Sequence, residues 1–265
     1  SFESPKVFDK LRLPADSKLR QGIVISNPLG EDYSVMRTTT LNGMLSSLAT
    51  NYNRRNKDVR LYELGNVYRP KALPLTELPD ERMHFTLGMY GNGDFFDMKG
   101  VCEEFFEKVG MRDKVDYDPN SGKTYLHPGR QANMVYDGKV VGYLDTYGIG
   151  DKAYVAVIDI LTVLEFASFN HKYTGIAKYP AVTRDLSMVV PKTVLAGQIE
   201  HILTQRGGKI LESYQLFDIY EGNQIKGGYK SMAYSLVFRH HDKTLEESEI
   251  TAAMKKILNG LTDLV

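Results

Sequence analysis

Cysteine, net charge and long apolar runs are scarce or absent in this sequence of 265 residues. Cys102 is its one cysteine, so no intrachain disulfide can form, which predicts a reducing compartment. Lysine and arginine together number 33, as do aspartate and glutamate. This balance disfavours a generic, strongly basic nucleic-acid-binding domain but leaves a small basic patch open. No apolar run approaches membrane-spanning length and no signal segment opens the chain, so we expect no membrane partner.

The composition is otherwise that of an ordinary globular protein. Apolar residues make up 42% and charged residues 25%, which argues against disorder. The length fits one or two domains, each with a sizeable core. Because the first residue is Ser1 rather than methionine, we expect the chain to be part of a longer protein.

The first part of the chain shows the patterns of helices and antiparallel strands. Thr39 or Thr40 is expected to cap a helix that runs to about Tyr52. Apolar spacing also predicts helices over 96–109 and 161–166, and strands over 59–68, 83–90, 132–136, 140–144 and 154–159. A hairpin turn is predicted at Asp137-Gly138. The aperiodic segment 173–179, followed by Pro180, predicts a boundary between domains over 1–172 and 173–265.

The second part predicts the order strand, helix, strand, strand, helix. These elements are expected over 182–190, 194–205, 210–220, 231–239 and 246–258. The order is that of a split βαβ unit that lacks its last strand. Such a sheet packs both helices on one face and leaves the other face open.

Side chains alternate across a strand, so the pattern predicts which face each one meets. The positions expected to face the helices are Leu186, Met188, Val190, Leu211, Phe217, Ile219, Met232, Tyr234, Leu236 and Phe238. The positions expected on the open side are Asp185, Ser187, Val189, Tyr214, Leu216, Asp218, Tyr220, Ser231, Ala233, Ser235 and Val237. A nucleobase stacked on Tyr220 and read by Asp218 and Ser231 would suit this open face. The pattern alone favours a simpler interpretation, a solvated face whose tyrosine covers sheet surface.

No motif for catalysis or metal binding is complete. Residues 120–124 (NSGKT) end like a phosphate-binding P-loop, but Tyr117 occupies the place of its first glycine and no helix pattern follows, which predicts a turn. The histidines lack metal-ligand spacing and no nucleophile elbow is present, so we expect neither a metal site nor a catalytic residue. Cys102 lies in an amphipathic helical pattern that predicts a buried structural thiol. Arginines in segments 60–69 and 127–132 could bind a phosphate or carboxylate.

Several motifs occur in order along the whole chain. They are SFESP (1–5), SNPLGEDYSVMRT (26–38), ELGNVY (63–68), FDMKG (96–100), HPGR (127–130), YPAVTRDL (179–186), LFDIYEG (216–222) and SMAYSLVFR (231–239). Through them the chain resembles the C-terminal part of the β subunit in the bacterial phenylalanyl-tRNA synthetase family. The resemblance covers essentially the full length.

The resemblance implies an α+β protein with two domains. The first, over 1–172, is expected to be a class II synthetase-like antiparallel sheet domain that has lost catalysis. It would support the catalytic α subunit in an assembly of two α and two β chains, and ATP and Mg²⁺ would serve the complete enzyme. Arg69 matches the class II arginine that grips ATP or adenylate, but residues 70–74 (PKALP) replace the acidic and histidine residues that follow it in active enzymes. This implies a pseudo-active site without a cofactor in this chain.

The second domain, over 173–265, is implied to be a ferredoxin-like anticodon-binding domain. The resemblance implies that base G34 of the phenylalanine tRNA is read by Asp218, Tyr220 and Ser231, with Ser187 close to the RNA. The cations expected to contact phosphates, on their charge alone, are Arg184, Lys230 and Arg239. The chain ends at residues 263–265 (DLV) without the family's closing strand and its arginine, so the fourth strand is expected to be short or missing.

We therefore expect a non-catalytic, cytoplasmic portion of phenylalanine–tRNA ligase that recognises the tRNA anticodon and does not aminoacylate alone. Two alternatives stay open: an independent class II-like adenylating enzyme, and a ferredoxin-like domain that binds a small-molecule regulator. Pyrophosphate exchange by the isolated chain would indicate the first. Amino-acid binding without protection of an anticodon stem-loop would indicate the second.

Overall fold

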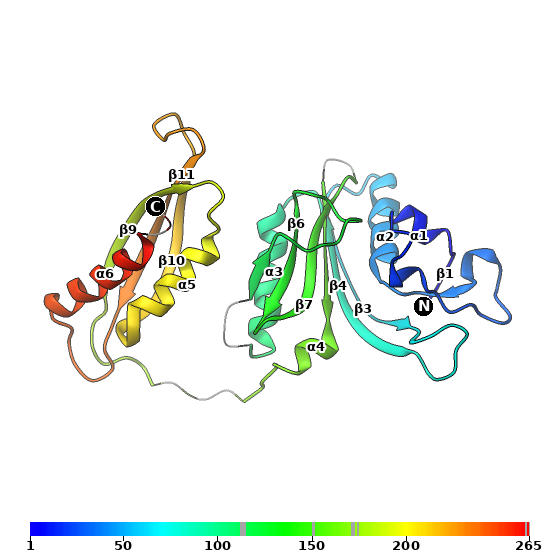
Figure 1. Ribbon diagram of the computed structural model, residues 1–265, viewed down its shortest axis with the longest axis horizontal. Helices are drawn as coiled ribbons and strands as arrows, with labels where there is room; N and C mark the ends of the chain where they lie inside the picture. Colours follow the sequence, from blue (N-terminus) through cyan, green and yellow to red (C-terminus); the bar gives the residue numbers. More distant parts are fainter. Residues whose placement is uncertain (112–114, 150–151, 171–172, 174, 263, 265) are drawn as a thin grey trace. The chain divides into compact units, whose positions relative to one another are not determined.

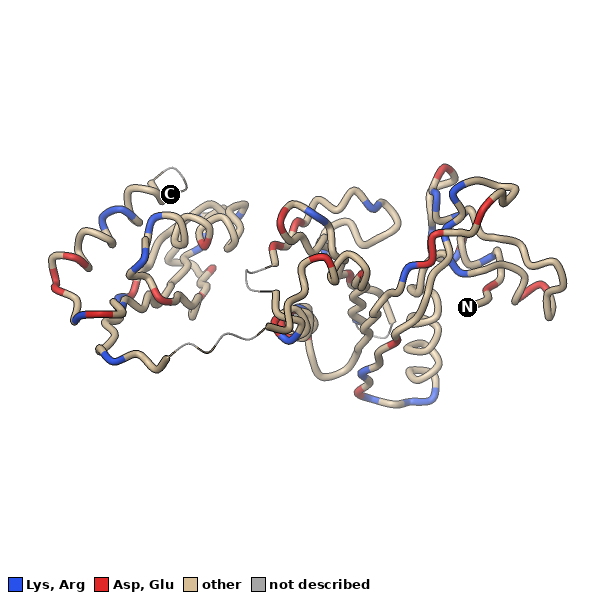
Figure 2. The backbone as a smooth tube through the Cα atoms, turned by 90° about the horizontal axis from the view of Figure 1, so that it is seen from below, with Lys and Arg blue, Asp and Glu red and all other residues tan. Residues whose placement is uncertain are grey.

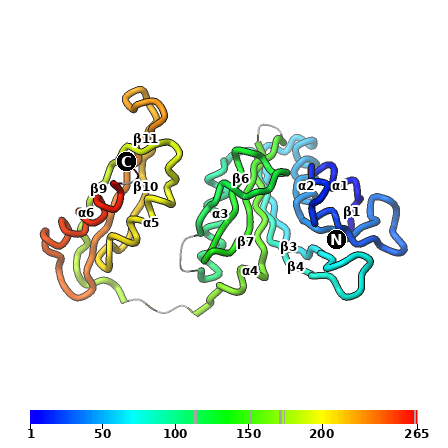
Figure 3. The backbone as a smooth tube through the Cα atoms, viewed as in Figure 1, coloured from blue at the N-terminus to red at the C-terminus, as the bar shows by residue number. Residues whose placement is uncertain are grey.

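The computed structural model describes residues 1–111, 115–149, 152–170, 173, 175–262 and 264. They fall into two compact units, Ser1–His171 and Lys172–Val265 (Figure 1). Hydrophobic cores lie within each unit, and Figure 3 traces the chain through their elements. None of the helices in the described ranges is long and apolar enough to cross a bilayer.

The first unit is built on a six-stranded sheet in which every neighbouring pair is antiparallel. In sheet order the strands are β3 (Val59–Arg69), β4 (Asp80–Tyr90), β8 (Ala153–Asp159), β7 (Lys139–Tyr147), β6 (Gln131–Tyr136) and β5 (Asp116–Asp118). A small separate ribbon pairs β1 (Phe2–Glu3) with β2 (Val35–Met36). The predicted Asp137-Gly138 turn joins β6 to β7 with φ values of 46° and 73°, the positive angles that a type I′ turn needs.

Helices cover both faces of this sheet. The helices α1 (Val7–Lys10) and α2 (Leu41–Asn53) share a core with one face, and α3 (Phe95–Lys108) and α4 (Ile160–Leu164) share a core with the other (Figure 1). Gly88 on β4 permits the close approach of α2, because a methyl group there would lie 2.5 Å from the sulfur of Met44. The adjacent Leu87 and Met89 pack on the α3 side, as alternation requires.

The two longer helices of this unit begin where their sequences predict. The Thr39 hydroxyl accepts a hydrogen bond of 3.2 Å from the backbone nitrogen of Leu41, while Thr40 bonds to Thr86 on β4. The α3 helix opens on a reciprocal capping box that pairs Asp94 with Asp97. Cys102 is fully buried on α3, and burial raises the pKa of its thiol to about 12. The prediction of a structural thiol is thus confirmed.

The second unit has the predicted order of elements. They are β9 (Val182–Pro191), α5 (Ala196–Gly207), β10 (Leu211–Tyr220), β11 (Tyr229–Phe238) and α6 (Glu247–Leu261). The strands pair antiparallel in the order β10-β11-β9, and one core joins them to both helices. We call the sheet side that meets α5 and α6 the helix face, and the opposite side the open face. In the described part the sheet has three strands, while positions 263 and 265 of the expected chain end lie outside the described residues.

The predicted faces of β9 and β11 are confirmed. The positions predicted to face the helices are all buried: Leu186, Met188, Val190, Met232, Tyr234, Leu236 and Phe238. Ladder partners point to the same side of a sheet, and the register pairs Met232 with Met188 on one face and Ala233 with Ser187 on the other. Simple alternation therefore describes both strands correctly.

The predicted faces of β10 are partly wrong, because two β-bulges interrupt this strand. The register shifts between Leu211 and Ser213 and again between Leu216 and Asp218. Each bulge adds one residue and reverses the alternation beyond it. Leu216 therefore pairs with buried Tyr234 and lies on the helix face, not on the open side as predicted.

The same bulges explain the other errors on β10. Tyr214 pairs with Leu236 and packs against the helix core, although it was expected on the open side. Phe217, expected in the core, is the extra residue of the second bulge and is 56% exposed. After that bulge the original alternation returns, so Ile219 pairs with Met232 on the helix face, as predicted, but its side chain is 49% exposed rather than buried.

The buried hydroxyl of Tyr234 supplies a stability prediction. This side chain is fully buried, and within the described residues its oxygen has no hydrogen-bond partner. Tyr234→Phe is expected to raise the free energy of unfolding by about 1 kcal/mol, since it removes a desolvated polar group. The urea midpoint checks this at an unchanged m-value. Tyr90→Phe is the matched control: the Tyr90 hydroxyl donates to the Asn56 carbonyl at 2.9 Å, so its loss should lower the midpoint. A lower midpoint for Tyr234→Phe would contradict the prediction.

Candidate functional site

The open face of the second unit brings together four residues predicted from the sequence. Tyr220 on β10 is the direct ladder partner of Ser231 on β11. Asp218 is the partner of Ala233, which in turn is the partner of Ser187 on β9. The hydroxyl oxygens of Ser187 and Ser231 lie 3.5 Å apart. Three adjacent strands thus present a carboxylate, an aromatic ring and two hydroxyls on one surface.

The geometry of this surface suits a flat ligand. Ala233 lies between Asp218 and Ser187 and carries only a methyl group, so no large side chain projects from the centre of the surface. Tyr220 stays 41% exposed, and no ion pair engages Asp218 among the described residues. An exposed aromatic ring can stack on a base while a carboxylate and hydroxyls bond to the base edge.

The three cations expected to contact phosphate do not join this surface. Arg184 pairs in register with buried Leu236, and its guanidinium contacts the Glu247 carboxylate at 2.6 and 2.8 Å. Lys230 is the partner of buried Val190, which assigns it to the helix face. Arg239 follows β11, and its Nε lies 3.3 Å from the Glu212 carboxylate. Acidic and basic residues are interspersed along both units (Figure 2).

Tyr229 belongs to the same open face and was missed by the sequence prediction. It lies two residues before Ser231 on β11 and pairs with Pro191. The Lys226 ammonium lies 5.5 Å from the centroid of its ring. The strand was predicted to begin at Ser231, because the glycine pair 227–228 marks a loop. Extending the alternation back by two residues would have found Tyr229.

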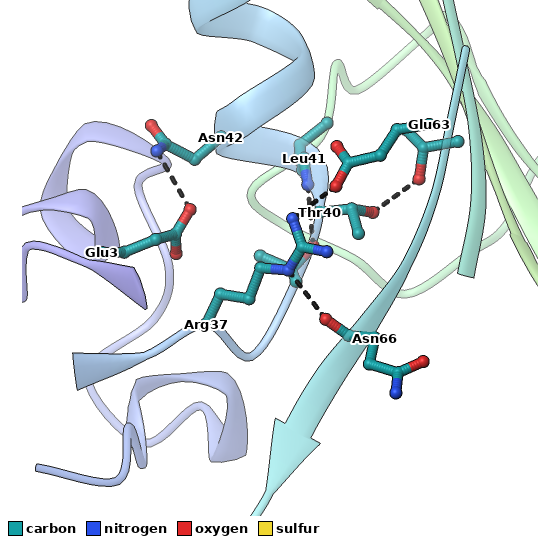
Figure 4. A network of polar contacts seen from close by, with 9 residues as sticks. Glu3, Arg37, Thr40, Leu41, Asn42, Glu63 and Asn66 are labelled. Carbon is teal, nitrogen blue, oxygen red and sulfur yellow. Dashed lines mark hydrogen bonds and ion pairs between the residues drawn. The ribbon is translucent and has the colours of Figure 1, made fainter. Parts of the chain in front are cut away.

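Two arginines of the first unit, Arg37 and Arg82, are held in internal contacts. Arg37 donates from Nη1 to the Glu63 carboxylate at 2.5 Å and from Nε to the Asn66 carbonyl at 2.7 Å (Figure 4). Gly65 leaves the necessary space, since a methyl group there would lie 2.2 Å from Nη2 of Arg37. On the neighbouring strand, the Arg82 Nε contacts Asp159 at 2.6 Å. These guanidinium groups are already neutralised by the chain's own carboxylates.

The sheet face beneath α2 is filled mainly by apolar and tyrosine side chains. Its buried core consists of Val7, Phe8, Leu11, Leu13, Val35, Leu41, Met44, Leu48, Val59, Tyr90, Leu126, Ala153, Val155 and Val157. The half-buried residues Tyr125, Tyr143 and Tyr147 pack against it. Side chains from the N-terminal segment thus cover the central strands on this face.

The P-loop-like segment does not form a phosphate cradle. Residues 119–124 are followed by a turn rather than by a helix, as predicted. The Lys123 ammonium contacts the Asn133 side-chain oxygen at 2.5 Å, and burial lowers the pKa of this lysine. Within the described part of the chain, no three histidine, cysteine, aspartate or glutamate side chains are grouped closely enough to hold a metal ion.

Two buried titratable groups in the first unit have oppositely shifted pKa values. Burial, with the nearby positive charge of Arg69, lowers the pKa of His84 to about 4. Burial raises the pKa of Asp145 to about 6, although its carboxylate accepts a hydrogen bond of 3.1 Å from the His127 backbone nitrogen. Both side chains are nearly inaccessible to solvent, so their charge states affect the stability of the fold.

Comparison with known proteins assigns the family. The model described as "Phenylalanyl tRNA synthetase beta chain CLM domain" matches residues 1–148. The chain belongs to the phenylalanyl-tRNA synthetase β-chain family. A second model, "Ferredoxin-fold anticodon binding domain", matches residues 177–265, which include all the strands and helices of the second unit. The predicted family and the α+β class with a ferredoxin-like second domain are therefore confirmed.

Curated members of the β-chain family match nearly all of the chain. The phenylalanine–tRNA ligase β subunit of Clostridium acetobutylicum is 43% identical over 98% of this chain and 34% of its own length. That of Bacillus subtilis is 32% identical over 91% of this chain and 32% of its own length. The chain thus spans about a third of these relatives. A solved pyrrolysyl-tRNA synthetase, PylSc of Desulfitobacterium hafniense, is 14% identical with a TM-score of 0.43, over 55% of this chain and 52% of that chain.

Proposed function

We propose that this chain is the part of a phenylalanine–tRNA ligase β subunit that recognises the tRNA anticodon and supports the catalytic α subunit without catalysing a reaction itself. The observation that carries the proposal is the convergence of Asp218, Tyr220, Ser231 and Ser187 on one exposed sheet surface. Membership of the β-chain family and the anticodon-binding match over residues 177–265 support it.

In the proposed complex, the unstacked base G34 lies against the ring of Tyr220. The Asp218 carboxylate accepts hydrogen bonds from the N–H groups on the guanine edge, a pair of donors that adenine lacks there. The hydroxyls of Ser231 and Ser187 bond to the base or its ribose. None of the three cations expected at phosphates is retained in this proposal: Arg184 and Arg239 form ion pairs, and Lys230 lies on the helix face.

The first unit is proposed to act as a scaffold in a cytoplasmic assembly of two α and two β chains. ATP, Mg²⁺ and the activation of phenylalanine belong to the α subunit in this proposal. Two features support it: the filled sheet face beneath α2, and exposed apolar side chains on edge strand β3. Tyr62 and Leu64 on edge strand β3 are well exposed, and their partners on β4 place them on the side opposite α2. Exposed apolar patches of this kind mark protein interfaces.

Footprinting of phenylalanine tRNA on the complete enzyme tests the proposal. The enzyme with residues 173–265 is expected to protect the anticodon loop from nucleases, and the enzyme without them is expected to leave it open. Protection that persists after this deletion would contradict the anticodon role. ATP–pyrophosphate exchange by the 265-residue chain alone would contradict the scaffold role and support an independent adenylating enzyme.

A further inference from the structure

The ring of Tyr220 lies directly against the backbone of Gly222. A methyl group at position 222 would lie 1.9 Å from Oη, 2.1 Å from Cζ and 2.7 Å from Cε2 of this ring. Such distances are far below van der Waals contact, so the ring could not keep its place beside any other residue. Gly222 does not have a positive φ angle. The close approach of the ring, rather than the backbone conformation, is therefore what requires a glycine here.

The backbone beneath the ring is held in place by several contacts. The Gly222 carbonyl accepts a hydrogen bond of 3.0 Å from the backbone nitrogen of Ile225. The preceding Glu221 carboxylate forms an ion pair of 2.7 Å with Lys192. The Lys192 backbone nitrogen donates to the carbonyl of Gly228 at 2.9 Å, at the end of the same loop. Because the loop is anchored at both ends, a side chain at 222 would displace the ring rather than the loop.

We infer that Gly222 is a positioning residue for base recognition: its bare backbone seats the Tyr220 ring in the orientation that stacks on the unpaired base. The inference rests on the proposed anticodon role of Tyr220. Stacking depends on the direction of the ring plane, and a side chain already held against a fixed backbone loses less rotational freedom on binding than one that turns freely. Gly222 acts only through Tyr220 and does not itself contact the RNA.

A double-mutant cycle on the complete α and β enzyme tests this inference. Gly222→Ala is introduced alone and together with Tyr220→Ala, and the Kd for an anticodon stem-loop RNA is measured by fluorescence anisotropy. Gly222→Ala is expected to weaken binding about three- to tenfold, the factor that corresponds to a side chain forced from its preferred rotamer. In the Tyr220→Ala background it should cause no further loss. Gly227→Ala is the matched control in the same loop, because a methyl group there meets no atom within 4 Å.

The cycle separates this inference from the proposal on which it rests. If Tyr220→Ala leaves stem-loop binding unchanged, the proposed function itself is wrong. If Tyr220→Ala weakens binding but Gly222→Ala does not, only the positioning role is overturned. An equal loss from Gly222→Ala in both backgrounds also overturns it, because a damaged loop or a misfolded domain would act whether or not the ring is present.

Discussion

Replacing Tyr220 by alanine is expected to weaken the use of phenylalanine tRNA by the complete ligase by about 1–3 kcal/mol, the usual contribution of one base–aromatic stack. The ring is half exposed on the open face beside Ser231, so its removal takes away a stacking surface without opening the core. Activation of phenylalanine, measured by pyrophosphate exchange without tRNA, should stay unchanged. Equal losses in both steps would instead indicate a stability defect.

Asp218→Ala should lower the same tRNA-dependent rate by a similar amount, about 1–3 kcal/mol, because a carboxylate bound to two base donors discriminates between bases by that much. It should also reduce the preference for guanine over adenine in stem-loops that differ only at position 34. The chain offers matched controls. Ile219→Ala alters the adjacent, comparably exposed residue on the helix face, and Asp185→Ala removes another exposed carboxylate from the open face. Neither control should change tRNA use.

The location of Asp218 and Tyr220 could be predicted from alternation only because two errors cancel. The bulge before Ser213 reverses the faces of β10, and the bulge at Phe217 restores them. Alternation is therefore right at both ends of the strand and wrong for Tyr214 and Leu216 between them. A bulge depends on which residues of the partner strand lie opposite, which period-two patterning in one strand does not contain.

The other differences at the site have different causes. Arg184 and Lys230 are even-numbered residues of β9 and β11, and the alternation that placed Leu186 and Met232 in the core already predicts the helix face for them. Their predicted contacts with phosphates rest on charge alone and disagree with this alternation. The contact between Tyr220 and Gly222 has no such signal, because it depends on a ring rotamer and on the path of a loop.

The first unit could be predicted as a set of elements but not as an arrangement. Strands such as β4 and β8 and the Asp137-Gly138 turn follow from local patterns. The sheet order, in which β8 lies between β4 and β7, depends on long-range pairing that periodicity does not encode. The filling of the face beneath α2 by the N-terminal segment is likewise a long-range contact. The incomplete motifs already predict no catalytic residue in this unit, and the family resemblance adds the prediction of a class II fold that has lost catalysis.

The stability of the first unit should depend on pH through two buried groups that oppose each other. His84 has a pKa of about 4 when folded, below its usual 6.5, so the unfolded chain binds more protons and the free energy of unfolding falls as the pH drops through this window. Asp145 has a pKa of about 6 when folded, above its usual 3.8, so the folded chain binds more protons. The contribution of Asp145 to the free energy of unfolding therefore falls as the pH rises from about 4 to about 6. Between about pH 4 and 6 the two slopes partly cancel.

Asp145→Asn should remove the contribution of Asp145 to the pH dependence of the free energy of unfolding and leave that of His84. The substitution should leave the free energy of unfolding nearly unchanged at about pH 4 and raise it by about 2–3 kcal/mol at pH 7. This figure is the rise in the Asp145 pKa on folding converted at about 1.36 kcal/mol per pKa unit. Urea unfolding of the chain across this range of pH measures the change.

His84→Gln should remove the contribution of His84 and leave that of Asp145, so the free energy of unfolding should decline from about pH 4 to 6. Asp116→Asn, at an exposed carboxylate of the same unit, should change the free energy of unfolding by less than about 0.5 kcal/mol throughout. A gain for Asp145→Asn that is the same at every pH would mean that amide contacts, rather than the cost of the buried charge, produce it.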